Sequence, residues 1–247
     1  MNSNLKNHEL IIKSHKDVYD PSDDSYLLLE NLPVKNRLRF FKPNENQRFS
    51  IFRNSPEFHN RDIFYNENPK ILNIPKIFDF HNRKTIKKGD ICLDVGCGSG
   101  ILSIAMAKSG CSVVAVDINP AAIELTKRNA KLNEVEDKIS ARISDLFENC
   151  GDEKYDFIVF NTPYLPVNDK GILEKAWSGG ENFTVIHRFL SEVDKYLNKN
   201  GKFIILISSL TKINLKEYET KFKFEKIAEK KLFFEELYVF LVIPSFC

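Results

Sequence analysis

The sequence predicts an α/β fold in which seven strands form a doubly wound, mostly parallel sheet. From Gly89 onward, short apolar segments alternate with segments of helical character, an order that is typical of parallel sheets covered by helices. The link between the last two apolar segments is too short for a crossover helix, so we expect an antiparallel C-terminal strand. Glycine and polar residues follow several apolar segments, and this class of fold binds ligands at the carboxyl ends of its strands.

Each strand is predicted from an apolar run with polar or turn-forming residues on either side. The seven expected strands comprise residues 91–96, 112–118, 139–145, 155–160, 202–209, 224–232 and 236–243. Helices are expected at residues 101–110, 120–133, 181–197 and 214–222, and a further helix near the N-terminus is opened by Pro21. Pro120 suits the first turn of its helix, where a missing N–H group does no harm. Gly110 closes the helix before it.

The composition is that of an ordinary globular protein, with 43% hydrophobic and 28% charged residues among 247. No apolar run approaches the roughly 20 residues that span a bilayer, and the N-terminus lacks the apolar core of a signal peptide. The five cysteines form no CxxC pair, and the five histidines show no ligand spacing. We therefore expect a cytoplasmic protein with reduced thiols, no metal site and no membrane attachment.

Charge is distributed unevenly along the chain. Residues 35–88 carry 13 Lys or Arg against 5 Asp or Glu, whereas the remainder carries 23 against 29. We interpret this basic, Phe- and Asn-rich segment as an insert between an N-terminal helical segment (1–34) and the remainder of the domain (89–247). A loosely packed loop, contact with RNA or the ribosome, and docking of a protein partner are all compatible with it. Within the insert, residues 70–80 are expected to fold against the domain.

A glycine-rich turn follows the first strand of that domain. In the segment LDVGCGSG, Gly96, Gly98 and Gly100 permit positive φ angles and let a ligand approach the backbone closely. A tight turn without a ligand would explain the glycines alone. Because the next two strand ends also carry suitable chemistry, the pattern favours an adenosine-binding site.

Acidic residues end the second and third strands. Asp117, followed by Ile118, is placed to accept hydrogen bonds from both ribose hydroxyls of an adenosine. Asp145 is placed to accept one from the adenine amino group, with Leu146 as an apolar neighbour that covers the ring. A helix cap or a solvated loop acid is an alternative interpretation of Asp145.

The glycine spacing distinguishes between adenosine cofactors. The dinucleotide pattern G-x-G-x-x-G would require glycine at position 101, which is Ile101 here. The sequence instead reads G-x-G-x-G after Asp94, which resembles the first motif of class I S-adenosylmethionine-dependent methyltransferases. The resemblance implies S-adenosylmethionine as cofactor, with the glycine turn facing its methionine part and Asp94 among the cofactor-binding residues. It also implies a Rossmann-like methyltransferase sheet.

The fourth strand ends in FNTPYLP, residues 160–166. Asn161 to Tyr164 resembles the Asn-Pro-Pro-Tyr motif of methyltransferases that act on planar nitrogens, with Thr162 in place of the first proline. The resemblance implies that Asn161 also borders the cofactor, that Pro163 stiffens the loop and that Tyr164 covers the planar group. A simple proline-rich turn explains this segment only when it is taken alone.

The motif suits the chemistry of an amide nitrogen, whose delocalised lone pair is a poor nucleophile. The side-chain oxygen of Asn161 can accept one N–H of the target NH₂ group, and the carbonyl oxygen of Thr162 can accept the other. Both hydrogen bonds strengthen as positive charge develops on the nitrogen, so they favour the transition state. We therefore expect placement of the NH₂ group, rather than a strong general base, to carry catalysis.

Two further segments indicate a branch within these enzymes. DVYDPSDDSYLLLE (17–30) and KAWSGGENFTVIHRFL (175–190) resemble the archaeal and eukaryotic branch of the release-factor glutamine N5-methyltransferases. The resemblance implies methylation of the glutamine in the Gly-Gly-Gln loop of a class I translation termination factor. It implies that Asp24 and Ser25 help to close the cofactor pocket, although helix capping alone would also explain them. It further implies a small zinc-binding activator protein that pairs along the third strand.

An adenine-N6 methyltransferase acting on RNA or DNA would use the same asparagine clamp and is the nearest alternative. The basic insert could then supply the nucleic-acid surface, with phenylalanines that stack on bases, namely Phe40, Phe41, Phe52 and Phe58. A lysine methyltransferase fits less well, because a lysine amine needs deprotonation rather than an amide clamp. A non-catalytic S-adenosylmethionine-binding subunit would not need both Asn161 and Tyr164.

Overall fold

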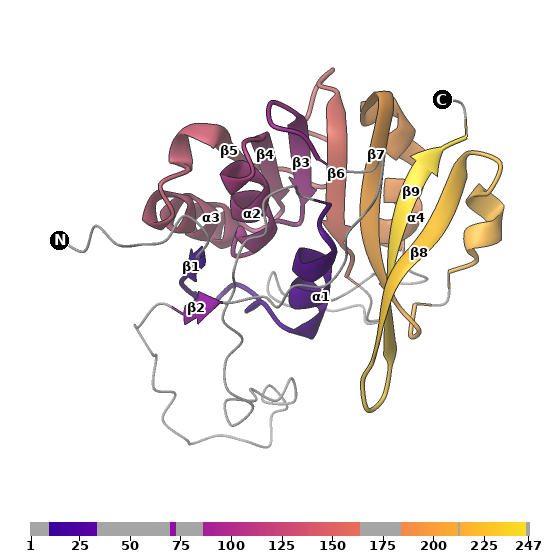
Figure 1. Ribbon diagram of the computed structural model, residues 1–247, viewed down its shortest axis with the longest axis horizontal. Coiled ribbons are helices and arrows are strands. Elements are labelled where there is room, and N and C mark those ends of the chain that lie inside the picture. Colours follow the sequence, from indigo (N-terminus) through magenta and orange to yellow (C-terminus); the bar gives the residue numbers. More distant parts are fainter. Residues whose placement is uncertain (1–9, 34–69, 73–85, 164–183, 212, 246–247) are drawn as a thin grey trace.

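The computed structural model describes residues 10–33, 70–72, 86–163, 184–211 and 213–245, and its main feature is a seven-stranded sheet (Figure 1). In spatial order the strands run β5-β4-β3-β6-β7-β9-β8. Their bounds are Ile91–Val95 (β3), Ser112–Asp117 (β4), Ile139–Ile143 (β5), Tyr155–Asn161 (β6), Leu197–Ser208 (β7), Phe222–Lys231 (β8) and Glu236–Pro244 (β9). The seven predicted strands are thus confirmed, with shifted ends.

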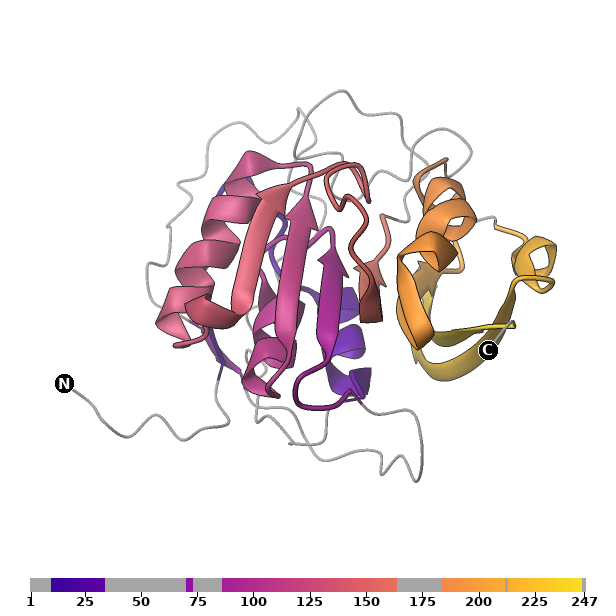
Figure 2. The same cartoon turned by 90° about the horizontal axis from the view of Figure 1, so that it is seen from above.

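The pairing of these strands confirms the predicted mostly parallel sheet with an antiparallel C-terminal strand. β3 pairs in parallel with β4 and β6, β4 with β5, and β6 with β7. β9 runs in the opposite direction to the other six strands and pairs antiparallel with its neighbours, β7 and β8. Because β3 to β6 run in one direction, their carboxyl ends lie at the same edge, and the arrows of β3, β4 and β5 in Figure 2 point the same way. β5 and β8 are the outer strands.

Helices cover both faces of the sheet. They are α1 (Asp23–Asn31), α2 (Ile101–Lys108), α3 (Pro120–Leu132), α4 (Thr184–Glu192) and short 3-10 helices at Glu136–Lys138, Val193–Tyr196 and Leu215–Tyr218. α1, α2 and α3 lie on one face, and α4 lies on the other (Figure 1). Alternate side chains of β3 point to opposite faces. Cys92 therefore packs with α1 and α2, whereas Leu93 and Val95 pack with α4.

Two helix predictions need correction. Residues 214–222 are predicted as a helix, but the structure has a single 3-10 turn there, and β8 already begins at Phe222. The cause is burial, since Phe222 packs edge-to-face against Phe203 in the core at a centroid distance of 5.3 Å. In the N-terminal helix, Pro21 lies before the N-cap residue Ser22 rather than inside the first turn.

A second, two-stranded sheet was not predicted from the sequence. β1 (Leu10–Ile12) pairs antiparallel with β2 (Lys70–Leu72). Asn129 and Asn133 lie four residues apart on α3, and their side-chain amides bind the backbone N–H and C=O groups of β1 and the residue after it at 2.6–3.1 Å. Side-chain amides thus replace a neighbouring strand, and a pattern of apolar residues gives no sign of this arrangement.

The basic segment 35–88 begins and ends at neighbouring points of the fold. The N–H group of the buried Ile86 donates a hydrogen bond of 2.6 Å to the carbonyl oxygen of Pro33. Of residues 70–80, which we expected to fold against the domain, the structure describes 70–72 in β2. Most of the remaining segment lies outside the described residues, so its interpretation as an insert and the domain boundaries around it stay predictions.

The described part of the chain contains no helix that is long and apolar enough to cross a membrane. Its four cysteines are buried and free. Within the same ranges, no group of three or more His, Cys, Asp or Glu side chains is placed to hold a metal ion.

Candidate functional site

The glycine-rich turn connects β3 to α2, and α3 holds it in place. Gly100 is the N-cap of α2 with a φ angle of +79°, and a Cβ atom there would lie 2.9 Å from the side chain of Thr126. The Thr126 hydroxyl donates a hydrogen bond of 3.1 Å to the carbonyl oxygen of Gly98. Gly96 and Gly98 also have positive φ angles. All three predicted glycines therefore adopt a conformation that other residues rarely take.

Asp94 lies near the end of β3, and its side chain is enclosed by protein. Its Oδ2 atom accepts hydrogen bonds from the N–H group (2.9 Å) and the hydroxyl (2.5 Å) of Ser103 on α2. Its Oδ1 atom is buried and has no hydrogen-bond partner among the described residues. Burial raises the pKa of Asp94 to about 7, although the hydrogen bonds from Ser103 oppose the rise. When Asp94 is ionised, its Oδ1 atom is thus an unpaired acceptor next to the glycine turn.

Asp117 ends β4 and contacts the same turn. Its Oδ2 atom accepts a hydrogen bond of 2.9 Å from the N–H group of Gly98, and its Oδ1 atom accepts one of 2.8 Å from that of Asn119. Burial raises the pKa of Asp117 above its ordinary value. Since each carboxylate oxygen has a second lone pair, the residue can still accept hydrogen bonds from a ligand. The neighbouring Ile118 is exposed.

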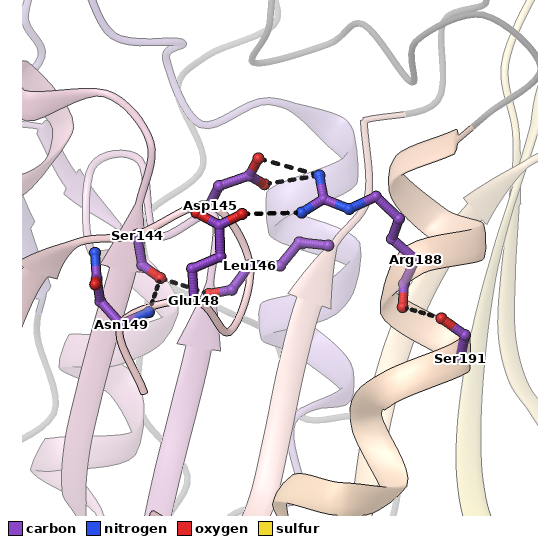
Figure 3. Close-up of polar contacts among 7 residues, drawn as sticks. All are labelled: Ser144, Asp145, Leu146, Glu148, Asn149, Arg188 and Ser191. Carbon is purple, nitrogen blue, oxygen red and sulfur yellow. Dashed lines mark hydrogen bonds and ion pairs between the residues drawn. The ribbon is translucent and has the colours of Figure 1, made fainter. Parts of the chain in front are cut away.

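Asp145 lies in the loop after β5, and α4 holds its side chain (Figure 3). Nη1 of Arg188 donates hydrogen bonds to both carboxylate oxygens of Asp145, at 3.2 and 3.0 Å, and Nη2 donates to Glu148 at 3.4 Å. Leu146 is buried and has a φ angle of +50°. Sequence reasoning missed Arg188, because nothing in the spacing of charges indicates a pair of residues that lie 43 positions apart.

Asn161 ends β6 at the same edge of the sheet. Its side-chain nitrogen donates to Oδ2 of Asp24 (3.2 Å) and to the hydroxyl of Ser25 (3.4 Å), both on α1. Its side-chain oxygen is buried and has no hydrogen-bond partner within the described ranges. Because a carboxylate only accepts hydrogen bonds, Asp24 turns the NH₂ group of Asn161 toward α1. The oxygen of Asn161 consequently faces the other way and is open to a donor.

Asp24 is itself fixed at the start of α1. It is buried, and its Oδ1 atom accepts a hydrogen bond of 2.6 Å from the N–H group of Ser25. An ion pair of 2.5 Å between Asp23 and Lys230 ties α1 to β8. The structure therefore brings Asp24 and Ser25 against Asn161, a contact that spans more than half of the chain and was not predicted.

The residues after Asn161 are described only in part. Thr162 and Pro163 are buried, and the Thr162 hydroxyl donates a hydrogen bond of 2.5 Å to the carbonyl oxygen of Leu206 on β7. Threonine thus has an anchor that the proline of the resembling motif could not provide. Tyr164 lies outside the described residues, whereas the other predicted site residues lie at the carboxyl edge of the sheet or beside it on α1.

Comparison with known proteins gives a consistent result. The model of the methyltransferase small domain family matches residues 80–234. A protein of Methanocaldococcus jannaschii described as a "putative protein N5-glutamine methyltransferase" is 36% identical over 239 residues, which cover 92% of each chain. A release factor glutamine methyltransferase of Aquifex aeolicus is 36% identical over 124 residues, which cover 46% of this chain and 44% of that protein.

Other matches are shorter or more distant. A ribosomal protein L11 methyltransferase of Anoxybacillus flavithermus is 39% identical over 122 residues, which cover 49% of this chain and 33% of that protein. The chain thus spans nearly all of the M. jannaschii protein but less than half of the other two relatives. Among solved structures, TrmN from Thermus thermophilus has a TM-score of 0.50 at 18% identity, covering 64% of this chain and 45% of that chain. That likeness concerns the fold alone.

Proposed function

Since the chain belongs to the methyltransferase small domain family of class I S-adenosylmethionine-dependent methyltransferases, we propose that it methylates the side-chain amide nitrogen, N5, of a protein glutamine. One observation carries the proposal. The side-chain NH₂ group of Asn161 donates hydrogen bonds to Asp24 and Ser25 on α1, while its buried side-chain oxygen is an acceptor without a partner among the described residues. The M. jannaschii relative, whose name specifies the same chemistry, supports it.

The fold implies binding of S-adenosylmethionine, and the residues at the strand ends fit this cofactor. We assign its three parts to successive strand ends: the methionine part to Asp94, Gly96, Gly98 and Gly100, the ribose to Asp117 and Ile118, and the adenine to Asp145 and Leu146. Asp24, Ser25 and Asn161 would border the methionine end. The open acceptor on Asp94 suits an ammonium donor, and the lone pairs left on Asp117 suit hydroxyl donors. When bound, the cofactor supplies an electrophilic methyl group.

In the proposed reaction, Asn161 and Thr162 hold the target amide by its two N–H groups. The Asn161 side-chain oxygen accepts one and the Thr162 carbonyl oxygen accepts the other, so that the nitrogen lone pair is directed at the methyl donor. Both hydrogen bonds strengthen as positive charge develops on the nitrogen. Pro163 would stiffen this loop and Tyr164 would cover the planar amide. As the N–C bond forms, the sulfur–methyl bond would break and leave S-adenosylhomocysteine, and the nitrogen would release its proton to water, so no strong base is required.

We further propose that the glutamine belongs to the Gly-Gly-Gln loop of a class I translation termination factor. The resemblance of residues 17–30 and 175–190 supports this substrate, as does the name of the A. aeolicus relative. A small zinc-binding activator protein would add a strand along β5, the outer strand whose Ile143 is 49% exposed. The positive charge of residues 35–88 supports contact with RNA or the ribosome.

The test is transfer of labelled methyl from S-adenosylmethionine to a purified archaeal-type termination factor, with and without the activator. A factor with the loop glutamine replaced by alanine, total RNA and DNA serve as alternative acceptors. We expect label on the intact factor alone. Asn161→Ala should lower kcat/KM by about a hundredfold to a thousandfold, as removal of a transition-state hydrogen-bond partner does.

Asn198→Ala is the matched control for Asn161→Ala. Asn198 lies at the start of β7 and donates to Asp156, away from the carboxyl edge, so this variant should retain activity. Label on RNA or DNA alone would reject the glutamine and support the adenine alternative. Equal label on the glutamine-to-alanine factor would reject the proposed acceptor position.

A further inference from the structure

Hydrogen bonds fix the backbone of the loop that carries Asp145. The hydroxyl of the buried Ser144 donates to the carbonyl oxygen of Leu146 and accepts from the N–H group of Asn149, both at 3.0 Å (Figure 3). The Ser144 N–H group donates to the carbonyl oxygen of Asp117 at 2.9 Å, which joins the ends of β5 and β4. Leu146 is held in the left-handed region that residues with a side chain rarely occupy. The backbone on both sides of Asp145 is therefore fixed.

The Asp145 side chain points from this loop toward α4, where Arg188 meets it (Figure 3). One nitrogen of Arg188 contacts both carboxylate oxygens, and the second reaches Glu148. Each carboxylate oxygen can accept two hydrogen bonds, so Arg188 leaves one acceptor position on each oxygen. The contact orients the carboxylate without saturating it.

Arg188 is held in turn by its neighbour Phe189, which is fully buried. The Phe189 ring lies 5.4 Å from that of Phe147, two residues after Asp145, and 4.8 Å from that of Phe160, which directly precedes Asn161. α4 thus contacts the loop after β5 and the end of β6 at once. This packing fixes the backbone of Arg188 relative to the loop that carries Asp145.

We propose that Arg188 is a positioning residue that fixes Asp145 for the amino group of adenine and thereby sets the base selectivity of cofactor binding. The inference rests on the assignment of adenine to Asp145 in the proposed function. A carboxylate attracts the amino group of adenine and repels the carbonyl oxygen that hypoxanthine has at the same position. This discrimination requires an oriented carboxylate, because a mobile one can turn away from the carbonyl oxygen.

The test compares two ligands by calorimetry, S-adenosylhomocysteine and S-inosylhomocysteine, which carry adenine and hypoxanthine. Wild-type protein should prefer the adenine form by roughly tenfold to a hundredfold, the factor that goes with a hydrogen bond to a charged group. Arg188→Met should weaken the adenine form by about 2- to 10-fold, the range for ordering one free side chain, and should reduce the preference. Arg188→Lys should restore part of both, since it can contact one carboxylate oxygen.

Arg142→Met is the matched control, because Arg142 on β5 forms an ion pair of similar exposure with Glu153 and does not contact Asp145. It should leave the adenine preference unchanged, and a thermal unfolding scan of each variant shows whether it is folded. Tighter binding of S-adenosylhomocysteine by Arg188→Met would overturn the inference, because it would mean that Arg188 competes with adenine. An unchanged preference in folded Arg188→Met would also overturn it. Failure of wild-type protein to bind either ligand would instead contradict the proposed cofactor assignment.

Discussion

Asp94 and Asp145 are the same residue type at one edge of the sheet, but the protein holds them by different means. Asp94 is 1% exposed and is held by the N–H group and hydroxyl of Ser103 on α2. The side chain of Asp145 is 35% exposed and forms an ion pair with Arg188, on the other face of the sheet. Asp94 is therefore buried and is held by a residue nearby in the chain, whereas the orientation of Asp145 depends on the packing of a helix that is distant in the chain.

The comparison shows that the two acids respond to different changes. Enclosure without an opposite charge makes the ionised form of Asp94 unfavourable, and its pKa rises accordingly. An ion pair that solvent reaches contributes little to stability, so the value of the Asp145–Arg188 pair lies in orientation. The stability of the fold should be sensitive to pH through Asp94 and sensitive to the packing of α4 through the residues that support Arg188.

The largest loss of stability should come from Phe189→Ala, which removes the packing that supports α4 and the loop of Asp145. Phe189 is fully buried between Phe147, Phe160 and Phe203. Its truncation should lower the free energy of unfolding by about 3–5 kcal/mol, as measured by urea denaturation. Phe189→Leu should lower it by less than about 1.5 kcal/mol because most of the volume is kept. A loss below about 1 kcal/mol for Phe189→Ala would contradict the role assigned to this ring.

A pH-dependent effect of intermediate size is expected at Asp94. The folded protein keeps the proton of this carboxyl up to about pH 7, whereas the ordinary value is 3.8. The folded state thus binds more protons between these values, and Asp94 lowers stability as the pH rises through this range. Asp94→Asn cannot ionise, so it should gain roughly 2–3 kcal/mol relative to wild type between pH 5 and pH 8. Urea denaturation at a series of pH values measures this difference.

Ser103→Ala sharpens this prediction. The variant removes one of the two donors that lower the pKa of Asp94, so its loss of stability should extend to higher pH than that of wild type. A constant difference between Asp94→Asn and wild type from pH 5 to pH 8 would show that Asp94 does not titrate in this range.

The smallest change in stability should follow Asp145→Asn. The ion pair with Arg188 is more than one-third exposed on both sides, and such pairs contribute about 0–1 kcal/mol. We expect a loss within that range, smaller at high salt, when unfolding is followed at two salt concentrations. A loss well above 1 kcal/mol would remove the contrast with Asp94.

Most of the fold could be predicted because alternation of strand and helix leaves few arrangements of the chain. The pattern failed where side chains or competing burial decide the structure. β1 is three residues long and is held by asparagine amides. Residues 214–222 have helical composition, yet burial of Phe222 draws the end of that range into β8.

The candidate site could likewise be predicted only in part. Topology brings the ends of β3, β4, β5 and β6 to one edge, so Asp94, Asp117, Asp145 and Asn161 could be selected from the sequence. The resemblance also selected Asp24, but its contact with Asn161 could not be predicted, nor could the contacts of Asp94 with Ser103 and of Asp145 with Arg188, because they depend on how helices pack on the sheet. The threonine that departs from the Asn-Pro-Pro-Tyr motif gains its anchor on β7 in the same unpredictable way.

The hydrogen bond between Pro33 and Ile86 has a consequence for how this protein can change over evolutionary time or in the laboratory. A segment whose two ends lie next to each other in the fold can change its length with little effect on the stability of the domain. Each doubling of its length adds only about 0.6 kcal/mol of loop-closure entropy. Residues 34–85 connect Pro33 to Ile86, and we predict that they behave as such a segment. A shorter linker could connect Pro33 to Ile86, provided that β1 keeps its hydrogen bonds with Asn129 and Asn133 when it no longer pairs with β2. We therefore predict that the length of residues 34–85 can change while the carboxyl edge of the sheet keeps its arrangement.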